Sequence, residues 1–297
     1  MRFSLGLPVH RVDAGAEFVS GDAVVSLSRA AEAAGFAAVF VTDHPAPPQR
    51  WVARGGHQTT DPLVTLAFAA AATTSLRVQT NLFVPAYRHA LVTAKAVATL
   101  DVLSGGRIIL GVGAGYLEPE FAALGADFDT RNDGLDDTLR TIVAAWAHDD
   151  VDGVATLPRP VQQPHPPIWI GGNSKRAIRR AVELGQGWVP MPSPAAAAGH
   201  LHTPGLESLD DLRARIGYLR EQADGAGRTE PLDICFMPSG LDMFAKAMPD
   251  TAQVRDDVAA LAEIGVTWAT VTLPGETRRD LLSAIEAFGA DVVSAPG

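Results

Sequence analysis

Short apolar runs alternate with longer amphipathic segments along the whole chain. The apolar runs lie at residues 3–9, 37–44, 76–84, 107–113, 167–172, 187–190, 232–238 and 268–274. Each is followed by a segment with apolar residues at helical spacing, at residues 22–35, 61–73, 90–106, 133–147, 174–185, 209–226, 252–265 and 278–289. The short runs predict strands buried on both faces, and the periodic segments predict helices.

Turn and cap residues fall between these segments where the predicted elements need them. Asp61 precedes Pro62 at the start of one helix, which is a good N-cap followed by the residue favoured in the first turn. Gly35 and Gly105 follow the ends of two other helices, where glycine is the preferred residue. These local signals agree with the hydrophobic pattern.

Eight strands, each followed by a helix, predict right-handed βαβ units and a parallel sheet. Eight units in a chain of 297 residues predict a closed (β/α)8 TIM barrel of the α/β class. A doubly wound sheet is the alternative, but its usual glycine fingerprint is missing from the first strand–helix turn. Two Gly/Pro-rich excursions, at residues 148–167 and 193–208, exceed what a barrel needs. Neither has the strands for a core of its own, so a single domain over residues 1–297 is expected.

Composition narrows the class of protein. The formal charge of −10 disfavours nucleic acid or an anionic membrane as the main partner. Cys235 is the only cysteine and lies in an apolar run, which predicts a buried strand residue and no internal disulfide. We find neither a signal peptide nor an uninterrupted apolar stretch of transmembrane length, so a cytoplasmic protein is expected. Histidines lack metal-ligand spacing, and no metal site is expected.

Polar residues and glycines gather where the predicted strands end. In a TIM barrel these carboxyl ends form the active-site face. The ends carry Thr42, Asp43 and His44, then Thr80 and Asn81, then residues 111–116, 171–174, 187–192 and 237–240. The sequence "GGNS" at residues 171–174 opens a helix, so its backbone amides predict an anion site, most plausibly for phosphate.

Glycines alternate at the end of the fourth predicted strand, at Gly111, Gly113 and Gly115. A dinucleotide fingerprint requires G-x-G-x-x-G, and Tyr116 stands where its third glycine belongs. Two other interpretations stay open. The glycines either admit a ligand close to the backbone or relieve crowding at the barrel rim.

A longer stretch carries a family resemblance. The residues "VPAYRHALVTAKAVATLDVLSGGRIILGVGAGYLEPEFAALGADFDTR", supported by "AAEAAGFAAVFVTDH" and "PIWIGGNSKRAIRRAVELGQGWVP", resemble the bacterial luciferase-like family of flavin and deazaflavin barrel enzymes. The similarity covers nearly the whole chain and is best to the branch that uses the deazaflavin coenzyme F420. Members of the family are commonly homodimers with the second and third barrel helices at the interface.

The resemblance implies roles for particular residues. It places His44 beside the reactive ring as the catalytic residue, next to Asp43. It places a non-proline cis peptide at Asn81–Leu82, following Thr80, against the back of the ring. The remaining residues that it assigns to the cofactor are Gly113, Ala114, Gly115 and Tyr116 near the side chain, and Gly171, Gly172 and Asn173 at the phosphate.

The sequence also departs from the family. The sugar-phosphate dehydrogenase branch has a catalytic glutamate where this chain has Ala114 or Gly115. Glu118 and Glu120 lie further on, and Glu118 is the tentative acid if the reaction needs one. The sequence does not identify the substrate, because the variable excursions form the pocket walls.

Three functions follow from the resemblance. The first is an F420-dependent oxidoreductase that transfers a hydride to or from a small organic substrate. The second is an FMN-dependent monooxygenase of the same fold, and the third is a non-catalytic flavin-binding barrel. Both cofactors carry a phosphate, but F420 adds a tail of carboxylates. The deazaflavin is preferred because the resemblance to its branch is joined by a basic cluster on the helix after "GGNS", at Lys175, Arg176, Arg179 and Arg180. A solvated helix face is the alternative interpretation of this cluster.

Overall fold

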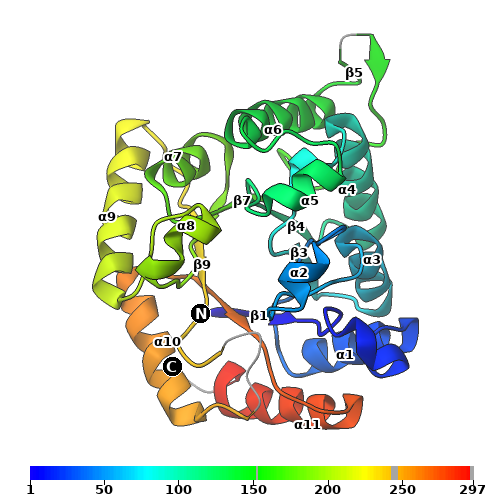
Figure 1. The fold of residues 1–297 in the computed structure, drawn as a ribbon, viewed down its shortest axis with the longest axis vertical. Helices are drawn as coiled ribbons and strands as arrows, with labels where there is room; N and C mark the ends of the chain where they lie inside the picture. Colours follow the sequence, from blue (N-terminus) through cyan, green and yellow to red (C-terminus); the bar gives the residue numbers. More distant parts are fainter. Residues whose placement is uncertain (152, 242–246, 295–297) are drawn as a thin grey trace.

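The computed structural model describes residues 1–151, 153–241 and 247–294, and its centre is a closed barrel of eight parallel strands (Figure 1). Around the barrel the strands follow the order β1, β2, β3, β4, β7, β8, β9 and β10, after which β10 pairs with β1. Their bounds are β1 Arg2–Gly6, β2 Ala38–Val41, β3 Arg77–Thr80, β4 Ile108–Val112, β7 Ile168–Gly171, β8 Gly187–Val189, β9 Asp233–Phe236 and β10 Trp268–Val271. The predicted (β/α)8 barrel is therefore confirmed, and the doubly wound alternative is excluded.

A ring of helices surrounds the barrel (Figure 1). These helices are α1 Gly21–Ala33, α3 Pro62–Ala72, α4 Ala90–Ser104, α6 Arg131–Ala147, α7 Lys175–Leu184, α9 Leu209–Gly225, α10 Thr251–Ile264 and α11 Arg278–Phe288. Asp61 caps α3 by accepting hydrogen bonds from two backbone amides, as predicted, and Ser174 caps α7 in the same way. No helix in the described part of the chain is long and apolar enough to cross a membrane.

Large side chains fill the inside of the barrel. Trp169 and Trp268 meet edge to face there, with ring centroids 5.1 Å apart, beside the fully buried Cys235. Burial raises the pKa of the Cys235 thiol to about 12, so this cysteine is a packing residue as expected. The barrel is a packed core and not a pore, which leaves the rim at the carboxyl ends of the strands as the place for a site.

Short elements lie outside the barrel and the ring. After β2 the chain forms α2, Gln49–Val52, and after β4 it forms α5, Glu118–Ala123. Four 3-10 or π-helical turns lie at η1 Val12–Glu17, η2 Pro85–Tyr87, η3 Ala195–Ala197 and η4 Gly289–Val293. The excursion at residues 148–167 carries a small antiparallel pair, β5 Asp150–Val151 and β6 Val154–Ala155, and its residue 152 is outside the described part. The excursion at residues 193–208 carries η3 and α8, Ala198–Leu201.

Candidate active site

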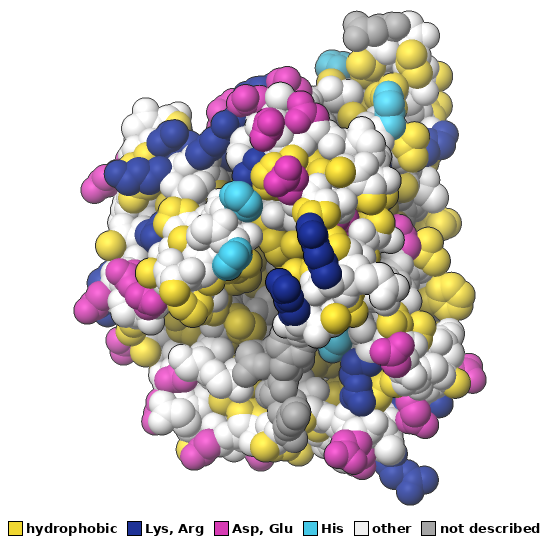
Figure 2. Space-filling view, viewed as in Figure 1, with side chains coloured by type: hydrophobic (Ala, Val, Ile, Leu, Met, Phe, Trp, Pro, Cys, Tyr) yellow, Lys and Arg dark blue, Asp and Glu magenta, His cyan; other side chains and the backbone are white. Residues whose placement is uncertain are grey.

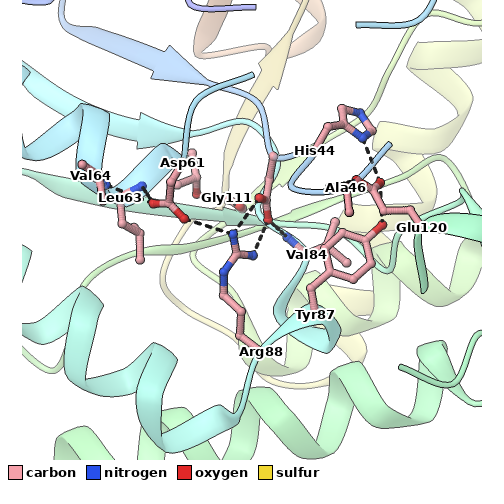
Figure 3. A network of polar contacts seen from close by, with 12 residues as sticks. His44, Ala46, Asp61, Leu63, Val64, Val84, Tyr87, Arg88, Gly111 and Glu120 are labelled. Carbon is pink, nitrogen blue, oxygen red and sulfur yellow. Dashed lines mark hydrogen bonds and ion pairs between the residues drawn. The ribbon is translucent and has the colours of Figure 1, made fainter. Parts of the chain in front are cut away.

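A buried histidine–glutamate pair lies at the carboxyl ends of β2 and β4 (Figure 3). His44 follows β2, and its Nδ1 atom is 3.0 Å from Oε2 of Glu120 on α5. Glu120 is fully buried, and only 9% of the His44 surface is exposed. A carboxylate so completely removed from water requires hydrogen-bond donors around it.

The loops after β2 and β3 supply those donors (Figure 3). The backbone amide of Ala46 donates to Oε1 of Glu120 over 3.0 Å, and the Tyr87 hydroxyl donates to Oε2 over 3.1 Å. With the carboxylate held in place, Nδ1 of His44 is the donor to Glu120, and Nε2 keeps its lone pair. A histidine in this arrangement can accept and return a proton through Nε2.

Aromatic rings surround the imidazole of His44. Its centroid is 4.8 Å from Trp51, 4.9 Å from His57 and 6.0 Å from Tyr116. The Tyr116 hydroxyl lies 3.5 Å from Nε2 of His44. Burial, followed by the charge of Glu120, raises the pKa of Tyr116 to about 12, so its hydroxyl stays protonated at neutral pH. The site therefore offers an apolar wall with one hydroxyl donor beside Nε2.

Two further histidines stay neutral at physiological pH. Burial, reinforced by Arg11, lowers the pKa of His10 to about 4. Burial, reinforced by His44 and His10, lowers the pKa of His57 to about 4, and Thr42 lies 3.2 Å from its Nε2 atom. His44 is thus the histidine of this group that contacts a carboxylate.

His10 and His57 should make stability fall as the pH drops from 6.5 toward 4. A histidine of the unfolded chain takes up its proton near pH 6.5, whereas these two do so only near pH 4 in the fold. The unfolded state binds more protons between pH 6.5 and pH 4. The free energy of unfolding therefore decreases as the pH decreases, and the loss reaches about 2 kcal/mol per histidine at about pH 4.5. Urea unfolding at pH 7 and about pH 4.5 measures the loss. A His10→Gln/His57→Gln variant that loses as much as the wild type would contradict this assignment.

The carboxylate of Asp43 is occupied by the protein. Both of its oxygens accept hydrogen bonds from Arg88, at 2.7 and 2.9 Å, and Oδ2 also accepts one from the Val84 amide (Figure 3). Arg88 also contacts Asp61 at the start of α3, over 3.3 Å. Asp43 therefore holds the loop after β3 against β2. Both of its carboxylate oxygens are used by the protein, so the side chain is not available to a ligand.

The loop after β3 has the cis peptide that the resemblance implies. The bond between Asn81 and Leu82 is cis. Thr80 is buried, and its hydroxyl donates to the Gly111 carbonyl over 2.8 Å. The Asn81 side chain is partly exposed and makes no hydrogen bond within the described residues. Asn81 is therefore available to a ligand, whereas the Thr80 side chain is not.

The glycines at the strand ends make room for Leu82. A Cβ atom on Gly171 would lie 1.9 Å from Leu82, and one on Gly113 would lie 3.3 Å from it. A Cβ atom on Gly111 would lie 2.1 Å from the Thr80 carbonyl oxygen. Of the two interpretations left open, crowding at the rim is the one that these contacts support.

The residues of segment 113–116 also differ in whether the fold requires them or leaves them open to a ligand. Gly115 has a φ of +78°, and a Cβ atom there would lie 2.6 Å from Phe121, so both conformation and packing require glycine. Ala114 and Tyr116 are partly exposed. These two are the residues of the segment that remain open to a ligand.

The predicted phosphate loop is partly used by the protein itself. The Asn173 side chain is fully buried, and it hydrogen-bonds the backbone at Met191 and Pro204, which holds the excursion at residues 193–208 against the barrel. The amides of Gly172 and Asn173 donate to the Val189 carbonyl and the Thr203 hydroxyl. Within the described chain, the amides without a protein partner here are those of residues 174–176, at the start of α7. The amides free to meet an anion are therefore on the first turn of α7, whereas those of Gly172 and Asn173 are already used by the protein.

The basic cluster on α7 is partly neutralised by a neighbouring helix. Arg176 pairs with Asp133 and Asp136 of α6, and Arg180 also pairs with Asp136. Arg179 donates to the Tyr218 hydroxyl of α9, and Lys175 lies over the Tyr218 ring. Two of the four cations are therefore paired with carboxylates, whereas Lys175 and Arg179 are exposed and contact a neutral side chain.

Glu120 is the residue that sequence reasoning missed. Glu118, the tentative acid, is exposed on the first turn of α5, whereas Glu120 points inward beside the buried Phe121. No signal in the sequence alone separates the two glutamates, because both lie on the same short helix and only its orientation buries Glu120.

The fold and site define a TIM-barrel protein with a candidate active site at the carboxyl ends of its strands. The chain belongs to the luciferase-like monooxygenase family, whose profile matches residues 1–265. This confirms the family resemblance.

Relatives within the family use different cofactors. The chain is 31% identical over 208 residues to the F420-dependent glucose-6-phosphate dehydrogenase of Microbacterium testaceum, covering 65% of this chain and 59% of the relative. It is 25% identical over 254 residues to the FMNH2-dependent dimethylsulfone monooxygenase of Pseudomonas putida, covering 76% of this chain and 64% of the relative. The crystal structure of monooxygenase RslO1 from Streptomyces bottropensis matches 98% of each chain with a TM-score of 0.79 at 20% identity, which supports the fold.

Proposed function

We propose that this protein is an oxidoreductase that transfers a hydride between coenzyme F420 and a small organic substrate. The observation that carries the proposal is the buried His44–Glu120 pair, which leaves Nε2 of His44 beside the aromatic wall of the rim. A substrate carbonyl or alcohol that gains or loses a hydride must also gain or lose a proton, and His44 is placed to exchange it.

The residues of the rim fit a phosphorylated flavin-type cofactor. The amides of residues 174–176, which have no partner among the described residues, would hold its phosphate at the start of α7. Ala114, Tyr116, Asn81 and the cis bond to Leu82 would border its ring. When bound, the cofactor supplies the hydride chemistry, and the protein supplies orientation and proton exchange.

The deazaflavin is preferred to FMN because of the relatives. The F420-dependent relative has the higher identity of the two described above, 31% against 25%. The basic cluster on α7 contributes less to this preference than its sequence suggests, because Arg176 and Arg180 are paired with aspartates of α6. An FMN-dependent monooxygenase is the second candidate, and the FMNH2-dependent relative favours it.

Reaction with dioxygen separates the two candidates. The purified protein is mixed with oxidised F420 and alcohols, with reduced F420 and aldehydes or ketones, or with reduced FMN and the same compounds, and each mixture is screened with and without dioxygen. The proposal expects oxidation or reduction of F420 that depends on the organic compound and proceeds without dioxygen. Dioxygen consumption coupled to product formation with reduced FMN would instead support the monooxygenase.

We also propose that the protein is a homodimer through α3 and α4. These helices are neighbours in the ring (Figure 1), and they expose Val64, Phe68, Val92 and Leu103, with 77% of the Leu103 surface in contact with solvent. Adjacent large apolar side chains on one surface mark an interaction site.

The Phe68→Glu/Leu103→Glu variant should be monomeric, because two buried carboxylates would oppose the interface. Size-exclusion chromatography with light scattering gives the mass of the wild type and the variant. Leu209→Glu, at an exposed leucine on α9, is the control and should leave the dimer intact. A wild type that elutes as a monomer would exclude this interface.

A further inference from the structure

Two exposed arginines lie on the segment that covers the candidate active site. Arg50 lies in α2, and Arg54 lies in the turn that follows this short helix. Neither guanidinium forms a hydrogen bond or ion pair with any residue that the structure describes. Arg88 at the same site is instead paired with Asp43.

This placement has an energetic cost that a ligand would remove. Two like charges four residues apart on one short segment repel each other when no anion lies between them. The chain has 34 acidic residues, yet none of those described pairs with Arg50 or Arg54. An anion bound between the two guanidinium groups would offset the repulsion and form charge-assisted hydrogen bonds with both.

The same segment also contacts the reactive histidine. Trp51 is the neighbour of Arg50 in the sequence, and its ring centroid is 4.8 Å from that of His44 and 6.4 Å from that of Tyr116. One short element therefore presents an aromatic surface to His44 and two cations to solvent. A molecule that occupies both would have an apolar body and an anionic end.

Histidines lie on the other side of the rim. His200 is in α8 and His202 follows it, and both are exposed. Figure 2 shows two Lys or Arg side chains over α2 and two His side chains over α8, facing each other across a hollow. The ring of His202 packs on Phe128, 5.1 Å away, which fixes one of these histidines at the rim.

We propose that Arg50 and Arg54 bind the carboxylate of the substrate, so that the enzyme selects organic acids whose apolar part reaches His44. This inference rests on the proposed function, because it takes the molecule bound beside His44 to be the substrate. Arg50 and Arg54 act in recognition, while His44 and Glu120 act on the reacting group.

Calorimetric titration with matched probes tests this selection. The probes are phenylbutyrate and its neutral amide, phenylbutyramide, with tri-γ-glutamate as a mimic of the F420 tail. The variants are Arg50→Ala/Arg54→Ala and Arg50→Lys/Arg54→Lys. Arg140→Ala/Arg213→Ala on α6 and α9 is the control, because it removes the same charge from exposed arginines on the outer helices.

The wild type should bind phenylbutyrate about tenfold more tightly than the amide, because one charge-assisted hydrogen bond changes the affinity by about that factor. The alanine pair should lose this preference, the lysine pair should keep part of it, and the control should match the wild type. A wild type without preference, or an alanine pair that keeps it, would overturn the proposal. Weakened binding of tri-γ-glutamate alone would overturn it too, because the arginines would then serve the cofactor.

Cofactor affinity separates this inference from the proposed function. F420 should bind the wild type and the Arg50→Ala/Arg54→Ala variant equally well. If F420 binds both but the preference for phenylbutyrate is missing, the substrate inference fails and the hydride-transfer proposal stands. If F420 does not bind the wild type, the proposed function fails, whatever the probes show.

Discussion

Replacing His44 with alanine should lower the turnover number by about 10³-fold, within the range that general acid–base groups contribute. The imidazole is held by Glu120, with Nε2 directed away from the carboxylate. His10 and His57 cannot substitute for it as acids near neutral pH, because their pKa values are about 4. Turnover is measured with saturating cofactor and a substrate found by the dioxygen-controlled screen.

Two controls separate proton exchange from binding. The His44→Ala variant should keep the dissociation constant of the cofactor nearly unchanged, and added imidazole should restore part of its activity. The His44→Gln variant can still donate a hydrogen bond to Glu120 but cannot exchange a proton, so it should be as slow as the alanine variant. Near-full turnover in either variant would make His44 a structural residue.

The Glu120→Gln variant should be the next most impaired, with turnover reduced by about 10²-fold. The glutamine keeps the shape of the side chain and one oxygen acceptor for Ala46 or Tyr87. Its amide can present a donor to Nδ1 of His44, which would move the histidine proton to Nε2 and remove the lone pair there. Glu120 is thus a positioning residue, and its loss should alter the pH profile of turnover as well as its size.

The Glu120→Ala variant shows whether stability contributes to this effect. Alanine leaves the Ala46 amide and the Tyr87 hydroxyl without their acceptor in a buried place. The free energy of unfolding should fall by about 3 kcal/mol, whereas the glutamine variant should unfold close to the wild type. A glutamine variant with wild-type turnover and an unchanged pH profile would show that Glu120 only supports the fold.

The barrel could be predicted because its signals are local. Strand 38–41 and helix 62–72 are each specified by their own apolar pattern, and the cap at Asp61 lies next to the helix that it starts. Eight repeats of such units leave few ways to close a sheet. The conformation of the two excursions could not be predicted, because their Gly/Pro-rich sequences have no repeating hydrophobic pattern.

Residues of the site could be predicted only where they directly follow a strand of the barrel. His44 and the cis bond at Asn81–Leu82 belong to this group, and a family resemblance supplied both. The partnership of His44 with Glu120 joins positions 76 residues apart. Glu118 and Glu120 stand two positions apart in the sequence, and only the orientation of α5 decides which of them is buried.

Long-range pairing also explains why the charge argument failed. Arg176 and Arg180 form a basic cluster in the sequence, but Asp133 and Asp136 meet them from a helix about forty residues earlier. Arg50 and Arg54 attract no notice in the sequence, because two arginines near a tryptophan are common. Their lack of partners becomes visible only when the contacts of the folded chain are known.

A competitive titration of the two cofactors tests the central claim most directly, because it requires no substrate. The protein is saturated with FMN, F420 is added, and the bound fraction of each is followed by fluorescence and by equilibrium dialysis. F420 should displace FMN and bind with the lower dissociation constant. FMN that binds tightly and is not displaced by F420 would contradict the assignment and establish the flavin monooxygenase as the better account.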